Sequence, residues 1–163
     1  MDLEKGREIF FKYNGSRFYI DRECPNEYKK CGIPLEIEKQ WLEEIKHDLL
    51  VKVKELKGAY RMQAINDYIQ ISDFASSICL LSEILLESGV DTFSSIILLE
   101  TLKQYLRRNI SDNLKRDIEK TIIDSKKKLL EKEISVDDSY KNLNYMIDYD
   151  FSKDSIMNRI NKL

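Results

Sequence analysis

Residues that break helices are scarce in this chain. Among its 163 residues there are only five glycines and two prolines. A fold built from many short strands needs frequent tight turns, and glycine and proline are the residues that favour such turns. We therefore expect long uninterrupted elements, which favours helices. Hydrophobic residues make up 42% of the sequence, which is enough for a packed core and argues against global disorder.

Apolar residues recur every three or four positions through most of the chain after residue 34. Over residues 35–57 this spacing joins Trp41, Ile45 and Leu49 into the stripe of an amphipathic helix. Asp91, Ser111 and Ser152 are suitable N-caps for helices that follow them. The helix predicted over residues 73–88 is apolar on most sides, so we place it at the centre of the domain. Further helices are predicted over 92–108 and 111–133, from Ser135 through Tyr140 to Ile147, and after Ser152. Residues 59–71 fit a helix, although 68–71 would also suit a strand.

The segment from Ile9 to Ile20 reads IFFKYNGSRFYI and contains the dipeptide Asn14-Gly15. Asn-Gly is a strong local signal for a two-residue hairpin turn, because both central residues of a type I′ turn need positive φ. Such a turn would place Phe11 opposite Phe18 on one apolar face of a ribbon. The sequence therefore predicts an N-terminal β-hairpin, followed by a loop over residues 21–33.

These patterns predict a mainly α fold with a minor β part. The expected architecture is a multi-helix bundle, or a short α-solenoid-like array, with an N-terminal β-hairpin. We expect one domain over residues 1–163, in which 1–33 form the hairpin and loop and 34–163 form the helical body.

Charge and cysteine content indicate a cytoplasmic protein. The formal net charge of −2 excludes a protein that is polycationic as a whole. The chain has an odd number of cysteines, namely Cys24, Cys31 and Cys79, and no secretion signal is recognised. We therefore expect reduced thiols in the cytoplasm. No apolar run approaches the roughly 20 residues that a membrane span requires. The abundance of Ile, Lys, Asn and Tyr suggests a bacterial source.

No combination of residues predicts catalysis. Glu44-x-x-His47 has the spacing of a di-iron motif, but that site needs a second such motif and the chain has one histidine. The cysteines lack the spacing of a zinc site, and no phosphate-binding loop or nucleophile elbow is present. We therefore assign no catalytic, cofactor-binding or metal-binding residue and predict no cofactor.

An acidic, tyrosine-rich stretch near the C-terminus is the strongest candidate for partner binding. Tyrosine is enriched at interface hot spots, and complementary charge accelerates encounter with a partner. The alternative is that some of these tyrosines belong to the core, and Tyr145 is the one we expect to be exposed. The predicted partner-binding residues are Asp137, Asp138, Tyr140, Tyr145, Asp148, Tyr149 and Asp150.

A basic segment supports a different interpretation. Residues 102–132 hold ten Lys or Arg residues against five Asp or Glu residues, which gives +5. A patch of this kind is suited to contact nucleic-acid phosphates. Consecutive residues of a helix point about 100° apart, however, so the alternative is that most of these side chains cover the solvent-exposed face of a helix. The residues of this alternative are Arg107, Arg108, Lys115, Arg116, Lys120 and Lys127.

The favoured hypothesis is a non-catalytic protein-interaction domain that neutralises or regulates a protein partner, as immunity proteins and antitoxins do. A helical nucleic-acid-binding protein that uses residues 102–132 is the first alternative, and an enzyme with a dispersed site is the second. The sequence predicts no membrane contact and leaves a homo-oligomer open.

Overall fold

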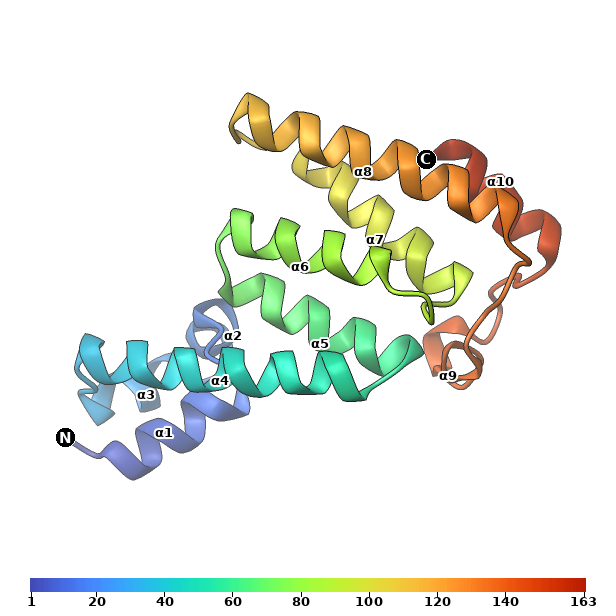
Figure 1. The fold of residues 1–163 in the computed structure, drawn as a ribbon. Helices are drawn as coiled ribbons and strands as arrows, with labels where there is room; N and C mark the ends of the chain where they lie inside the picture. Colours follow the sequence, from blue (N-terminus) through green and yellow to red (C-terminus); the bar gives the residue numbers. More distant parts are fainter. The chain divides into compact units, whose positions relative to one another are not determined.

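The computed structural model describes residues 1–163 and consists of ten α-helices and one 3₁₀ helix, with no β-strand (Figure 1). The mainly helical class predicted from the sequence is confirmed, whereas the predicted minor β part is absent. The elements are α1 (Leu3–Lys12), α2 (Arg17–Glu23), α3 (Pro25–Cys31), α4 (Leu35–Glu55), α5 (Gly58–Ile71), α6 (Phe74–Leu86), α7 (Thr92–Tyr105), α8 (Asp112–Glu131), α9 (Asp138–Lys141), η1 (Asn144–Met146) and α10 (Lys153–Lys162).

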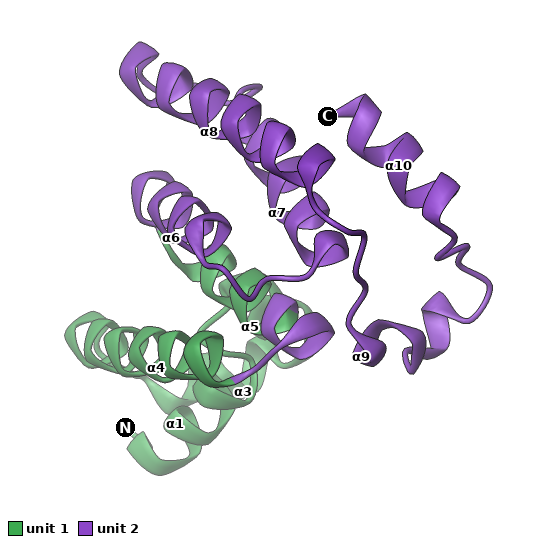
Figure 2. Cartoon of the chain, turned by 45° about the vertical axis from the view of Figure 1, so that its right-hand side comes forward, with its two compact units in different colours: residues 1–55, 63–72 green, residues 56–62, 73–163 purple.

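The chain divides into two compact units, coloured separately in Figure 2. Unit 1 comprises Met1–Glu55 and Gln63–Ser72, and unit 2 comprises Leu56–Met62 and Asp73–Leu163. Helix α5 contributes its first residues to unit 2 and the remainder to unit 1. No helix of the chain combines the length and the apolar content that crossing a lipid bilayer requires.

Unit 1 is built around an aromatic cluster. Helix α1 packs against α3 and α4, and α2 packs against α3. The ring of Phe10 lies 6.1 Å from that of Tyr28 and 5.7 Å from that of Trp41, measured between centroids, and all three side chains are buried. Ile45, Leu49 and Val53 continue the buried stripe along α4, so the amphipathic helix predicted over 35–57 is confirmed.

The predicted N-terminal β-hairpin is wrong. Asn14 and Gly15 do have positive φ, at 48° and 69°, but they end a helix instead of joining two strands. The Gly15 N–H donates to the Phe10 carbonyl at 2.8 Å and the Asn14 N–H donates to the Phe11 carbonyl at 3.0 Å. This is the Schellman pattern of helix termination, which also needs a residue with positive φ. An Asn-Gly pair, which readily adopts positive φ, is therefore compatible with a hairpin turn and with a helix end.

The segment predicted as a loop over residues 21–33 is also helical. Helix α2 extends to Glu23, and α3 begins at Pro25, where the missing proline N–H has no helical partner to lose. Gly32, with φ of 61°, ends α3. Residues 59–71, for which helix and strand were both open, belong to helix α5.

Unit 2 is a helical bundle whose central element is α7. Helix α7 packs against α6, α8 and α10, and α6 also packs against α8. Phe93, Ile96, Leu98 and Leu102 of α7 are almost fully buried, which means that the helix is enclosed on most sides. The sequence placed the 73–88 helix in this central position, and that prediction is wrong. The C-terminal end of α6 is open to solvent, since Leu86 is 72% exposed.

Three helices of unit 2 begin directly after the N-caps predicted from the sequence. The side chains of Asp91 and Ser111 accept the backbone N–H groups of Ser94 and Leu114, and Ser152 accepts that of Ser155. The helix expected from Ser135 to Ile147 is interrupted, because α9 has only four residues and is followed by the short η1.

Candidate functional site

The predicted partner-binding residues lie in α9, at its N-cap and in the stretch between α9 and α10, and we call residues 137–151 the acidic tyrosine segment. Its first residues are fixed to the start of α5. The Ser139 hydroxyl accepts the Ala59 N–H at 2.9 Å, and the Asp137 carboxylate accepts the Ser139 N–H at 3.0 Å. The hydroxyl and the N–H of Ser139 lower the pKa of Asp137, since both donate to its ionised form. The entry into the segment is therefore anchored to the start of α5.

Tyr140 belongs to the core of unit 2. Its side chain is 3% exposed, and its ring meets that of Phe93 edge-on at 4.8 Å. Its hydroxyl lies 2.7 Å from the Ser94 hydroxyl, so the polar end is hydrogen-bonded in the interior. Burial raises the pKa of Tyr140 well above its usual value. The structure thus places Tyr140 out of reach of a partner.

Tyr149 is half-buried against α7 and α10. The Arg159 guanidinium donates to the Tyr149 hydroxyl at 2.8 Å and to the Glu100 carboxylate at 3.0 Å. The Tyr149 ring packs at 5.3 Å from Phe93 and at 4.7 Å from Phe151. Tyr149 therefore holds the chain against the bundle, and only part of its surface is open to solvent.

The remaining predicted residues form an exposed surface. Tyr145 is 80% exposed, as expected from the sequence, and Ile147 is 77% exposed. Sequence reasoning placed Ile147 on a buried helical stripe, but the stripe does not exist because α9 ends at Lys141. We call the exposed members of the segment the acidic tyrosine surface, which consists of Asp138, Tyr145, Ile147, Asp148 and Asp150.

The three carboxylates of this surface differ in their surroundings. Asp138 forms an ion pair with Lys141 at 2.9 Å. Asp150 accepts the N–H and the hydroxyl of Ser152, and these bonds lower its pKa. Asp148 forms no hydrogen bond or ion pair within the chain and is exposed. Asp148 therefore has no partner within the chain and is accessible to a cationic group of another protein.

Only some of the basic residues of the nucleic-acid alternative share one face. Arg107 and Arg108 follow the end of α7, and the others are distributed around α8. At 100° per residue, Lys115 lies about 140° around the helix from Lys120. Arg116 is engaged by Asn113, to which it donates at 2.6 Å. Arg116, Lys120 and Lys127 lie within about 40° of one another around α8, so these three form a short basic stripe that Lys115 does not join.

The residues weighed for catalysis or metal binding are dispersed or already engaged. Glu44 accepts a bidentate pair of bonds from Arg7, while His47 points to solvent on the same helix. The Cys31 thiol is buried and donates to the Glu27 carbonyl. No group of three or more His, Cys, Asp or Glu side chains is arranged to hold a metal ion.

One buried carboxylate was missed by sequence reasoning. Glu38, on α4, is 7% exposed and accepts the Tyr28 hydroxyl at 2.8 Å and the Arg17 guanidinium. Burial and the bond to Glu38 raise the pKa of Tyr28. Both carboxylate oxygens are engaged, so this group serves the packing of unit 1. Glu38 lies one helical turn before the buried Trp41, and this spacing was the feature of the sequence that indicated its burial.

Comparison of the chain with protein-family models, with curated proteins and with solved structures gives no match.

Proposed function

We propose that this chain is a non-catalytic protein-interaction domain, which docks a basic protein partner through the acidic tyrosine surface. The observation that carries the proposal is the exposure of Tyr145 and Ile147, at 80% and 77%. These two large side chains lie only two residues apart in the sequence, and their apolar surface is costly to leave in water. Burying them against a partner removes that cost. Tyrosine is also among the residues that dominate binding energy in measured interfaces.

The charge around these side chains favours a basic partner. Asp138, Asp148 and Asp150 are exposed, and Asp148 has no partner within the chain. Complementary charge steers the encounter of two proteins and disfavours partners of the same sign. A positively charged surface with a shallow apolar recess would satisfy both parts of this site.

The acidic tyrosine segment is anchored at both ends. Tyr140 fixes one end of the segment to Ser94, and Tyr149 fixes the other end through Arg159. A segment held at both ends loses little conformational entropy when it binds, which increases affinity for a given contact area. By covering a basic surface of its partner, the domain would neutralise or regulate that partner in the manner of an immunity protein or an antitoxin.

The proposal is tested by comparative affinity capture from cells that express the chain. Three tagged forms are used: the wild type, the double variant Tyr145→Ala/Ile147→Ala, and Tyr60→Ala as a matched control. Tyr60 is 58% exposed and lies outside the acidic tyrosine surface. The expected result is a basic protein that the wild type and Tyr60→Ala retain and the double variant loses.

Retained proteins are eluted with increasing salt, since a charge-steered complex weakens as ionic strength rises. Purified partner is then titrated against Asp148→Lys, which is expected to bind at least roughly fivefold more weakly because attraction becomes repulsion. An identical set of proteins on all three forms contradicts the proposal.

A further inference from the structure

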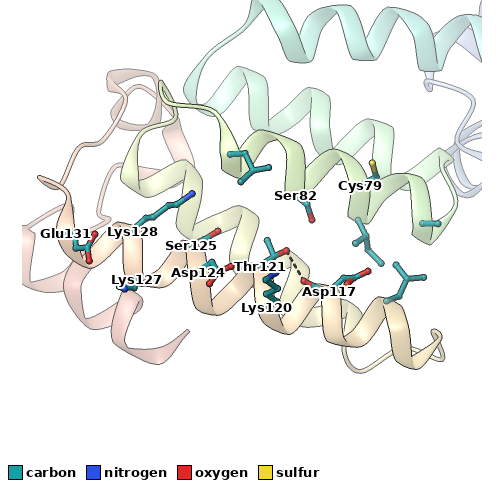
Figure 3. Close-up of a pocket in the computed structure, with 14 residues that line it drawn as sticks. Cys79, Ser82, Asp117, Lys120, Thr121, Asp124, Ser125, Lys127, Lys128 and Glu131 are labelled. Atoms are coloured by element: carbon teal, nitrogen blue, oxygen red, sulfur yellow. Dashed lines mark hydrogen bonds between the residues drawn. The ribbon is translucent and has the colours of Figure 1, made fainter.

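Two hollows on the surface of unit 2 differ in their charge. The larger one lies between α6 and α8 (Figure 3) and has a volume of about 790 Å³. Its α8 wall carries three lysines and three carboxylates, so the charges cancel and favour no class of ligand. These residues are Lys120, Lys127, Lys128, Asp117, Asp124 and Glu131. The smaller one lies between α7 and α10, which pack against each other, and we call it the α7–α10 pocket.

The α7–α10 pocket is strongly basic. Residues of α7 and of the turn that follows it form one wall, and residues of α10 form the other. Four cationic side chains line it against one carboxylate: Lys103, Arg107, Arg159 and Lys162 against Glu100. The volume of about 310 Å³ falls at the lower end of the range of roughly 300–1,000 Å³ that small-molecule sites span. The excess of positive charge favours an anionic ligand.

Two of the four cations are already engaged by the fold. The Arg159 guanidinium donates to both oxygens of Glu100, at 3.0 and 2.5 Å, which neutralises the one carboxylate of the pocket. The Lys103 ammonium donates to the carbonyl oxygens of Lys162 and Leu163, at 2.9 and 3.0 Å, and so satisfies the C-terminal end of α10. A terminal carboxylate at Leu163 would pair with the same ammonium. Arg159 and Lys103 therefore have structural roles.

Arg107 and Lys162 have no such role. Both side chains are exposed, and neither takes part in an ion pair or a hydrogen bond within the chain. The end of α7 is closed without the Arg107 guanidinium, because the backbone N–H groups of Arg107 and Arg108 donate to the carbonyls of Gln104 and Tyr105. Two like charges beside one hollow repel each other, and a bound anion removes that cost.

We infer that the α7–α10 pocket binds phosphate, free or as the monoester of a small molecule, through Arg107 and Lys162. A phosphate monoester carries about two negative charges at neutral pH, which matches the two free cations, and it offers three acceptor oxygens. Arginine binds phosphate through parallel N–H bonds, and lysine acts as a point charge. The Gln104 amide adds a neutral donor to the lining. A polynucleotide would need a longer groove of cations that follows its backbone.

Binding is measured by nuclear magnetic resonance on the isotope-labelled full chain, tagged at its N-terminus and titrated at constant ionic strength. The probes are inorganic phosphate, glycerol phosphate and acetate. The variants are Arg107→Gln and Lys162→Gln, each of which removes one charge and keeps a polar side chain. The matched control is Arg108→Gln, which removes the same charge from a neighbouring exposed residue outside the pocket. Thermal unfolding confirms that each variant is folded.

The expected result is a saturable shift of the Gln104, Arg107 and Lys162 amide signals with both phosphates, at a Kd on the order of 1 mM. Each pocket variant should weaken binding at least roughly fivefold, and Arg108→Gln by less than about twofold. Binding of glycerol phosphate should weaken as the pH falls from about 7.5 to about 5.5, since the second pKa of a monoester is about 6. No histidine lines the pocket, so this change reports the ligand.

The two phosphates identify the source of the ligand. Tighter binding of glycerol phosphate assigns the pocket to a phosphorylated small molecule, and equal binding assigns it to the free ion. Both results support the inference, because the phosphate group is the part that Arg107 and Lys162 recognise.

Three results would overturn the inference. One is an absence of shifts, or shifts that rise linearly up to roughly 20 mM phosphate. Another is an equal response to acetate, which would show general attraction of anions. The third is equal weakening by Arg108→Gln, or tighter binding of a single-stranded oligonucleotide that depends on Arg108, which would indicate a nucleic-acid surface. The acidic tyrosine surface is intact in every variant used, so failure here leaves the proposed function standing.

Discussion

The hydroxyl of Tyr140 lies 2.7 Å from the hydroxyl of Ser94 inside unit 2, 46 residues earlier in the chain. This contact separates the tyrosines of the acidic tyrosine segment into two classes. Tyr140 and Tyr149 hold the segment against the bundle, while Tyr145 is left in solvent. The division has measurable consequences for stability.

Removal of the Tyr140 hydroxyl is expected to destabilise the chain, and removal of the Tyr145 hydroxyl is not. Tyr140→Phe loses a buried hydrogen bond and should lower the free energy of unfolding by about 1 kcal/mol. Tyr145→Phe should change it by less than about 0.5 kcal/mol, as is usual for an exposed position. Urea unfolding followed by circular dichroism measures both. Equal effects of the two substitutions would show that the tyrosines do not differ in burial.

A side chain at Gly58 is expected to disrupt the contact between α5 and the acidic tyrosine segment. Gly58 has φ of 53°, and a Cβ there would overlap the Asp137 carboxylate and the Ser139 hydroxyl. Gly58→Ala should lower the free energy of unfolding by about 1–3 kcal/mol through strain and overlap.

The matched control for Gly58 is Gly89→Ala. A Cβ at Gly89 meets no atom within 4 Å and its φ is not in the left-handed region. Its unfolding free energy should stay within about 0.5 kcal/mol of the wild type. If Gly58→Ala were as stable as Gly89→Ala, the packing of Asp137 on the start of α5 would be wrong.

Asp137 is expected to make stability depend on pH in the acid range. Its pKa in the folded chain is lowered from 3.8, because the hydroxyl and N–H of Ser139 donate to the carboxylate. The ionised form therefore stabilises the fold above pH 3.8, and this contribution is lost as the pH falls through the lower folded pKa.

The comparison for Asp137 is Asp137→Asn, which keeps an oxygen acceptor for the cap but does not titrate. The wild type should be the more stable of the two at neutral pH, and the difference should shrink as the pH falls below 3.8. Urea unfolding at a series of pH values measures this. A difference that stays constant down to the lowest pH would rule out the lowered pKa.

Two phenylalanines distinguish the helical N-terminus from a hairpin. Phe10 is 2% exposed and Phe18 is 68% exposed. Phe10→Ala should therefore cost about 3–5 kcal/mol of unfolding free energy, and Phe18→Ala less than about 0.5 kcal/mol. A hairpin with Phe11 and Phe18 on its buried face would reverse the order of the two effects, so chemical unfolding of the two variants decides between the structures.

Local signals in the sequence located most helix boundaries. Asp91, Ser111 and Ser152 bond to N–H groups only three residues ahead, so a cap can be read from a few positions. The failure at Asn14-Gly15 has the same origin. Positive φ was predicted correctly there, but a hairpin turn and a Schellman cap both require it. The choice depends on Phe10, which is buried against Tyr28 and Trp41 of later helices.

The candidate site was located by composition but not resolved in detail. The acidic and aromatic content of residues 137–151 identifies the segment, and the spacing suggested that Tyr145 is exposed. The partners that bury Tyr140 and Tyr149, Ser94 and Arg159, are brought there only by the packing of α7 and α10. The exposure of Ile147 follows from the early end of α9, which no local signal announced.

Photo-crosslinking in living cells tests the central claim most directly. A benzophenone amino acid is introduced in place of Tyr145 and, separately, in place of Tyr60, which is exposed at the start of α5 in unit 2. We expect irradiation to attach a basic protein covalently to position 145 and not to position 60. No adduct at position 145, the same adducts at both positions, or an adduct with nucleic acid would contradict the assignment of this surface to a protein partner.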